Sequence, residues 1–411
     1  MKRGTFEGRL LVLVTLGLVA FGLVLVYSAT SAPAALARTD PMSYLKKQGV
    51  YALLGVGLMM AATRFDYRRL RLLAPSLLIS ALFLCLAVLA IGTRVNGARR
   101  WIAFGSATFQ PSELAKVALA IWVASYLSRR RAPQTVKDLW RPIGMLLCCF
   151  CALVLAEPDL GTAIAIVIVV AVILLVSGTP GRTLSLGAGI IAGLGLAAIV
   201  FSPYRRARFF SFLDPWHDAL GAGFQTVQAM ISLGSGGVFG VGLGQGVGKV
   251  NYLPEAHTDM IMAVIGEELG LVGVSGVIAA FAAFAYAGLR IALACKDPFG
   301  KRLAAGLVAL VSGQALINLA AVLGLAPLTG IPLPFISYGG SSLVVALLSV
   351  GILLNIAGAH GAEGRAAVPD RGRGDGRPRA AGARGRGSAA AARRAGDVRR
   401  VAGSRRGAAR S

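Results

Sequence analysis

The chain has 411 residues, of which 56% are hydrophobic and only 15% charged, and its formal net charge is +24. Soluble globular domains contain about a quarter charged residues, so the composition excludes an ordinary soluble protein. Apolar stretches of membrane-spanning length recur along the chain, which predicts an all-α polytopic membrane protein.

The first apolar run extends from Leu10 to Val26, after Lys2, Arg3 and Arg9 and before a stretch of small residues. Secretory signal peptides and uncleaved first helices share this pattern. The run is longer than a usual signal core and long enough to cross a bilayer, which favours an uncleaved helix. Together with nine later runs it predicts about ten transmembrane helices, at residues 10–26, 48–63, 72–92, 112–128, 142–156, 160–177, 183–201, 260–289, 303–325 and 340–357.

The short loops between these spans predict the orientation. Lysine and arginine gather between spans two and three, four and five, and eight and nine, on the side that also holds the N-terminus. The positive-inside rule makes that side the cytoplasm. Both termini are then cytoplasmic, and residues 201–258 form a large extracytoplasmic loop.

Seven basic residues fall on the predicted outer side, against this rule. An anionic ligand on that face would explain them, and so would interfacial anchoring by snorkelling side chains. They are Arg94, Arg99, Arg100, Arg205, Arg206, Arg208 and Lys249.

The outer loop also contains a glycine-rich run from Gly234 to Lys249. The run fits no nucleotide motif, because Val250 follows Lys249 where a P-loop needs Ser or Thr, and no register gives G-x-G-x-x-G. Its amides could cradle an anion, or its glycines could simply permit close packing. Close packing is the favoured interpretation.

Beyond the predicted membrane domain, residues 1–359, the chain is rich in Arg, Gly and Ala. Residues 358–411 hold 14 arginines and four acids. This composition cannot form a packed core, so residues 360–411 are predicted to be a disordered cytoplasmic tail. A membrane-tethered tail of this kind is expected to meet anionic lipid headgroups, or to bind nothing specific, rather than to bind nucleic acid.

Two places combine ionisable residues with membrane segments. Asp259 lies where a polar loop turns into the span 260–289, which makes it either a functional group or an N-cap for that helix. Glu113 and Lys116, three residues apart, share one face of the span 112–128 and are predicted to pair. Such a pair either serves the site or merely orients two helices.

Six stretches resemble, in order, the signatures of the SEDS family of peptidoglycan glycosyltransferases. The short link from Gly240 to Tyr252 resembles the FtsW (division) branch more than the RodA (elongation) branch. The stretches are Val26–Ala29, Arg99–Lys116 (RRWI and FQPSELAK), Glu157–Thr162 (EPDLGT), Ser211–Pro215 (SFLDP), Leu253–Gly270 (LPEAHTD and IGEELG) and Pro332–Ser342 (PLPFISYGGSS).

The resemblance implies an enzyme of the bacterial cytoplasmic membrane, at the division septum, that polymerises lipid II on the outer face. Asp259 is then the catalytic base. The implied substrate-binding residues are Arg100, Gln110, Glu113, Lys116, Asp159, Lys249, Glu255 and His257. No cofactor is certain, although a divalent cation, Mg or Mn, could assist departure of the pyrophosphate. A class B penicillin-binding protein transpeptidase and other division proteins are the implied partners.

Two other classes of function stay open. A lipid II flippase would use the same cavity without chemistry, and a scaffold would only recruit the transpeptidase. A flippase needs charged residues at mid-membrane depth, whereas here the strong polar groups are predicted near the outer side, which favours an enzyme. A scaffold would tolerate the loss of Asp259.

Overall fold

The computed structural model describes residues 6–36, 38, 40–95, 98–105, 107–250 and 253–366. Most of the described chain is helical, and it contains one short three-stranded sheet. The elements are α1 (Phe6–Leu36), α2 (Ser43–Arg64), α3 (Tyr67–Ile91), β1 (Thr93–Val95), β2 (Ala98–Phe104), β3 (Ala107–Phe109), α4 (Pro111–Arg129), α5 (Val136–Leu139), the π-helical turn η1 (Trp140–Gly144), α6 (Met145–Ala156), α7 (Leu160–Val176), α8 (Gly181–Val200), α9 (Pro203–Leu213), α10 (Phe224–Ser235), α11 (Ile261–Ala294), α12 (Pro298–Val322) and α13 (Gly340–Ala366).

Every one of the ten predicted spans is helical, which confirms the prediction of a polytopic all-α membrane protein. Seven segments of the described chain are long and apolar enough to cross a membrane: α1, α3, the stretch Val136–Ala156, α8, α11, α12 and α13 as far as Ala359. Helix α7 is apolar but has only 17 residues. Most of α4 is buried, and its residues Glu113 and Lys116 face the interior of the bundle rather than lipid, whereas Arg129 at its end is exposed.

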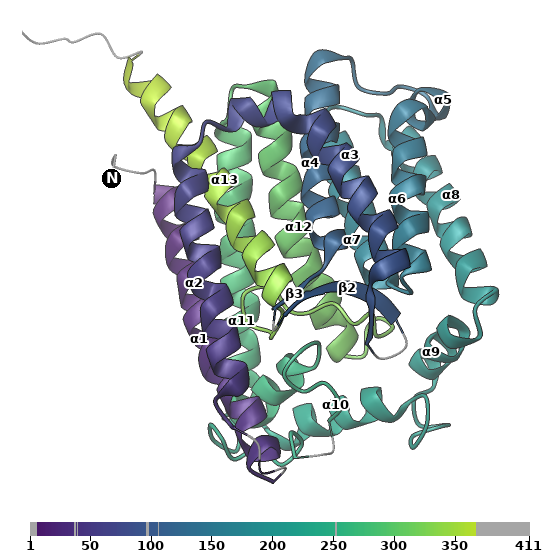
Figure 1. Cartoon of the computed structure of the whole chain (residues 1–411), viewed down its shortest axis with the longest axis vertical. Coiled ribbons are helices and arrows are strands. Elements are labelled where there is room, and N and C mark those ends of the chain that lie inside the picture. The colour runs from purple at the N-terminus through teal and green to yellow at the C-terminus, as the bar shows by residue number, and fades with distance from the viewer. Residues whose placement is uncertain are drawn as a thin grey trace, which may run out of the picture. The chain divides into compact units, whose positions relative to one another are not determined.

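The long helices run side by side, and the two ends of the bundle differ (Figure 1). One end carries the sheet, α9 and α10, and is called the strand face below. The other end carries the start of α1 and the loop that leads into α5, and is called the α5 face. Helix α12 lies at the centre, in contact with α4, α7 and α11.

Three features of the fold were not predicted from the sequence. The segment between α3 and α4 forms an antiparallel sheet in the order β1-β2-β3, with Gly105 at φ +63° in its second turn. The large loop contains the helices α9 and α10. Helix α13 continues to Ala366, past the predicted boundary at residue 359, and the tail from residue 367 onward lies outside the described residues.

Helix α11 is interrupted at Gly270, where φ is +64° and ψ is −159°. The N–H groups of Leu271 and Val272 donate to the carbonyls of Gly237 and Val238, at 3.0 and 3.1 Å, instead of to helix partners. A Cβ on Gly270 would lie 2.5 Å from the Val238 carbonyl oxygen, so no other residue fits without displacement. The glycine-rich loop therefore docks into the interruption of α11.

Candidate active site

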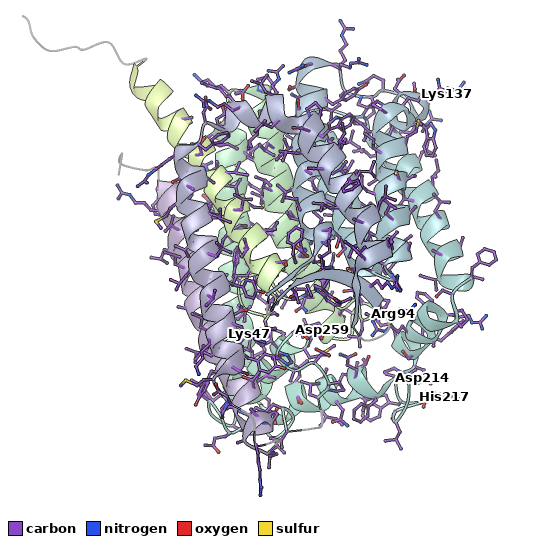
Figure 2. All side chains as sticks on the ribbon, viewed as in Figure 1. Lys47, Arg94, Lys137, Asp214, His217 and Asp259 are labelled. Carbon is purple, nitrogen blue, oxygen red and sulfur yellow. The ribbon has the colours of Figure 1, made fainter. Side chains whose placement is uncertain are left out.

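Asp259 lies at the strand face, directly before α11 (Figure 2). Its carboxylate accepts a hydrogen bond from the Thr258 hydroxyl at 3.3 Å. Its main-chain carbonyl accepts from the Asn318 side-chain amide on α12 at 2.8 Å, and the same amide donates to the Ile331 carbonyl at 2.8 Å. Asn318, which is buried, thus fastens the backbone of Asp259 to the segment between α12 and α13.

The Asp259 carboxyl is an unusually basic one. Burial raises its pKa from 3.8 to about 6, the negative charge of Glu255 adds to the rise, and the positive charge of Arg208 on α9 opposes it. Glu255 is exposed and itself accepts a hydrogen bond from Thr258 at 3.1 Å. A carboxylate with a pKa near 6 is still ionised at neutral pH and accepts protons better than an ordinary aspartate, as a general base requires.

The predicted pair of Glu113 and Lys116 is confirmed. The Lys116 ammonium lies 2.8 Å from a Glu113 carboxylate oxygen, and both side chains are buried in α4. Pro111 begins this helix, so the two charges stand in its first two turns, near the strand face. Because each charge compensates the other, neither can be lost alone without leaving a buried charge unpaired.

Three other predicted residues meet where α6 turns into α7, and together they are called the turn cluster. The Arg100 guanidinium donates to the carbonyl oxygen of Glu157 at 2.9 Å. Asp159 caps α7 by accepting from the Thr162 N–H and hydroxyl at 3.0 and 2.9 Å. Gln110 donates to the Asp159 carboxylate at 3.2 Å. The structure thus gives Arg100, Gln110 and Asp159 internal partners and brings them together.

Glu157 is a further candidate for the site that the sequence did not single out, although it begins the EPDLGT motif. It is fully buried in the turn between α6 and α7. Burial raises its pKa to about 8, the charge of Asp159 adds to this, and Arg100 and the Ser112 hydroxyl oppose it. Glu157 is therefore mostly protonated at neutral pH and can act as a hydrogen-bond donor there.

The turn cluster and the Asp259 segment pack against the same stretch of chain. A Cβ on Gly161, in the first turn of α7, would lie 2.5 Å from the Ile331 side chain. Ile331 is the residue whose carbonyl Asn318 binds, and a Cβ on Gly330, which has φ +72°, would lie 4.0 Å from an Asp259 carboxylate oxygen. The segment between α12 and α13 therefore joins the two groups into one site.

Lys249 lies apart from this site, in a buried cluster with α1 and α11. Its ammonium is 2.6 Å from a Glu268 carboxylate oxygen and donates to the Gly244 carbonyl at 2.8 Å and to the Ser28 hydroxyl at 3.1 Å. Three partners inside the protein occupy the three N–H groups of the ammonium. A substrate-binding role for Lys249 stays a prediction, and these contacts do not favour it.

The glycine-rich run binds a carboxylate of the protein itself. The N–H groups of Val247 and Gly248 donate to Glu267 at 2.7 and 3.0 Å. A Cβ on Gly240 would collide with the Glu268 carbonyl oxygen, so that glycine permits direct backbone contact with α11. The packing interpretation of these glycines is confirmed, and the anion that their amides hold is internal.

His257 is half-buried, two residues before Asp259. Its carbonyl accepts from the Tyr338 N–H at 2.9 Å, and its ring meets the Tyr44 ring edge-on, with centroids 4.8 Å apart. Burial lowers the pKa of His257, and the negative charge of Glu255 opposes this, so the fold favours the neutral ring. The ring packs between the aromatic rings of Tyr44 and Tyr338.

Arg208 is one of the seven basic residues of the predicted outer side, and its position against the positive-inside rule is the signal that the sequence offers for it. The positive charge of Arg208 acts to lower the pKa of Asp259, against the effect of burial. Among the described residues, no three His, Cys, Asp or Glu side chains gather as a metal site would require. The residues present therefore do not fit a divalent cation held by the protein alone.

These features define a polytopic membrane protein with a candidate acid–base site at one face of its helix bundle. The family model FTSW_RODA_SPOVE, described as "Cell cycle protein", matches residues 9–361. The chain belongs to this family, the SEDS proteins.

Individual relatives agree with this assignment. The chain is 44% identical over 352 residues to the "Probable peptidoglycan glycosyltransferase FtsW" of Geobacter sulfurreducens, covering 84% of this chain and 94% of that protein. It is 38% identical to the "Stage V sporulation protein E" of Bacillus subtilis, covering 84% of this chain and 96% of that protein.

Solved structures are also similar. One, described as "Structural coordination of polymerization and crosslinking by a peptidoglycan synthase complex", has a TM-score of 0.74 at 31% identity and covers 88% of this chain and 99% of that chain. The rod shape determining protein RodA of Thermus thermophilus has a TM-score of 0.64 at 30% identity and covers 87% of this chain and 97% of that chain.

Proposed function

We propose that this protein is a peptidoglycan glycosyltransferase that polymerises lipid II into glycan strands at the outer face of the bacterial cytoplasmic membrane, for septal wall synthesis during division. The observation that carries the proposal is the half-buried Asp259 carboxyl, with a pKa of about 6, held in place through its backbone at the strand face. The name of the Geobacter relative supports the activity and the division role.

In the proposed reaction Asp259 is the base. Its carboxylate takes the proton from the 4-hydroxyl of one disaccharide as that oxygen attacks the anomeric carbon of another. The bond from this carbon to undecaprenyl pyrophosphate breaks with inversion, and the pyrophosphate leaves with the electron pair. Positive charge near the leaving group stabilises the transition state, and Arg208 is the cation whose charge already reaches Asp259.

The other predicted substrate residues act as supports in this proposal. The hydrogen bonds of the turn cluster fix the chain where α6 turns into α7, and the ion pair of Glu113 and Lys116 keeps both charges of α4 compensated. A divalent cation, Mg or Mn, would have to be held jointly with the pyrophosphate. No step is assigned to one, because the described residues do not fit a site of their own.

The proposed orientation puts the strand face outside and both termini in the cytoplasm. The short-loop lysines and arginines at the α5 face support it. Single cysteines at positions 219 and 375 in a cysteine-free variant test it with an impermeant maleimide in intact cells. Labelling at 219 alone is expected, and labelling at 375 alone would reverse the orientation.

The proposed partner is a class B penicillin-binding protein transpeptidase, within a larger set of division membrane proteins. The similar peptidoglycan synthase complex, whose description names both polymerisation and crosslinking, supports a joint synthase. Co-purification of the tagged full chain with the transpeptidase from the same cell tests this proposal, and the proposal fails if the transpeptidase does not co-purify in a detergent that preserves activity.

Asp259→Asn separates the enzyme from a flippase or a scaffold. Asn keeps the size and capping ability of Asp but accepts no proton, so polymerisation should slow by about 10²–10⁴-fold, with lipid II binding unchanged. In the assay, the purified protein and its transpeptidase partner are incubated with lipid II, and the glycan product is then separated on a gel. Asp218→Asn is the matched control, since Asp218 is an exposed acid in the same loop that caps the N–H of Ala222. Near-normal product from Asp259→Asn would favour the flippase or the scaffold.

A further inference from the structure

An apolar groove of about 380 Å³ opens between η1 and α6 on one side, α7 on the second and α8 on the third. It is called the α8 groove below. Its walls are almost entirely hydrocarbon, with Leu147, Val170, Leu174 and Ile191 among the lining side chains. No feature of the proposed reaction uses it.

The α8 groove lies at the α5 face and reaches about halfway through the membrane. Its deepest residue on α8 is Ile191, ten residues after the helix begins at Gly181. At about 1.5 Å per residue the groove is roughly 15 Å deep, half of a hydrocarbon core about 30 Å thick. Figure 2 shows Lys137, beside the groove, and Asp259 at opposite ends of the bundle. The groove thus belongs to one leaflet, away from the site of the proposed polymerisation.

The mouth of the α8 groove is basic. Lys137 and Arg141 flank the lining residues Leu139 and Trp140, Arg182 precedes the lining residue Leu184, and all three basic side chains are exposed. The two segments that carry these cations are joined, because the Thr183 hydroxyl at the start of α8 donates to the Gln134 carbonyl, just before α5, at 2.7 Å.

The acid nearest in sequence to these cations, Asp138, offsets only one of their three charges. Asp138 accepts hydrogen bonds from the N–H and the hydroxyl of Thr135, at 3.1 and 2.9 Å, in the capping box of α5. The other acids between residues 129 and 182, Glu157 and Asp159, lie in the turn cluster at the strand face. The mouth therefore carries an excess of positive charge at the depth of lipid headgroups.

We propose that the α8 groove binds an anionic phospholipid of the leaflet at the α5 face. One acyl chain lies among the side chains of η1, α6, α7 and α8, and the headgroup phosphate meets Lys137, Arg141 and Arg182. Basic pockets between membrane helices select anionic headgroups in this way, and a groove one leaflet deep matches a phospholipid chain. The lipid-linked substrate is a different molecule, because its reacting headgroup belongs at the opposite face.

The test is retention of defined lipids by the purified full chain, measured by native mass spectrometry. Delipidated protein receives phosphatidylglycerol or phosphatidylcholine with the same acyl chains. Phosphatidylglycerol is expected to be retained at least about five-fold more strongly, since a basic residue near the membrane surface contributes a factor of this order. Equal retention of the two lipids would overturn the proposal.

Two variants locate the lipid. The triple change Lys137→Gln, Arg141→Gln and Arg182→Gln should abolish the preference for phosphatidylglycerol. The matched control, Arg64→Gln, Arg69→Gln and Lys296→Gln, removes three exposed cations from other loops of the same face and should keep the preference. Equal loss in both triple variants would mean a general surface charge effect, which contradicts the proposal.

Filling the α8 groove with a large side chain tests whether the acyl chain lies there. Ala188→Trp places a large side chain in the groove, whereas Leu186→Trp places it on an exposed part of α8 that does not line the groove. Only Ala188→Trp should reduce retention of phosphatidylglycerol, at equal melting temperature of the two variants. Unchanged retention in Ala188→Trp would refute this placement of the chain, as would a protein that co-purifies in the groove in place of lipid.

Discussion

Ionising Asp259 should lower the stability of the folded protein, and the pH at which this happens follows from the structure. The pKa is about 6 in the fold and 3.8 in an unsupported carboxyl. Between these values the native state binds more protons than the unfolded state, so stability falls as pH rises. One pKa unit corresponds to about 1.4 kcal/mol, so the loss is about 3 kcal/mol at pH 7.5, roughly half of that at pH 5, and nothing well below pH 3.8.

Asp259→Asn removes the ionisation, so the variant should unfold at a higher temperature than the wild type at pH 7.5, with a smaller gain at pH 5. The measurement is thermal unfolding in detergent, followed by tryptophan fluorescence at both pH values. The control is Asp218→Asn, an exposed acid whose removal should change little. Polymerisation by the wild type should fall as pH drops through about 6, because Asp259, the proposed base, is then protonated. A less stable Asp259→Asn, or a stability difference independent of pH, would refute the reasoning.

Three further predictions concern the buried contacts. Lys116→Ala should give less folded protein than Glu113→Gln with Lys116→Gln, because only the single change leaves a buried charge unpaired, and equal yields in size-exclusion chromatography would contradict this. For the same reason Lys249→Ala should lower the melting temperature more than Lys249→Gln with Glu268→Gln, and the opposite order would show that the pair is not buried as a unit. Asn318→Ala frees the backbone of the proposed base and should reduce kcat by about tenfold or more with little change in KM, whereas a change in KM alone would point to substrate contact.

The sequence alone determined the features that depend on local pattern. Hydropathy located the ten predicted membrane spans, because an unpaired backbone group is costly in lipid and a long apolar run therefore has few alternatives to a helix. The spacing of Glu113 and Lys116 determined their pairing, because residues three apart lie on one face of any helix. Motif order placed the chain in its family and singled out Asp259.

Tertiary structure decided the partners that are distant in the chain. Lys249 meets Ser28, 221 positions away, and Asn318 reaches the carbonyl of Asp259, 59 positions away. Neither contact has a sequence spacing that predicts it, because each depends on which helices pack together. Arg208 became a member of the site only because α9 lies near Asp259.

The surroundings of Asp259 and of Gly270 were likewise decided by the fold and not by the local sequence. The high pKa of Asp259 arises from burial, which no local pattern encodes. The interruption of α11 at Gly270 requires the glycine-rich loop to supply hydrogen bonds to the freed N–H groups. The sequence supplies the glycine that can adopt φ +64°, and only the approach of a second segment makes that conformation stable.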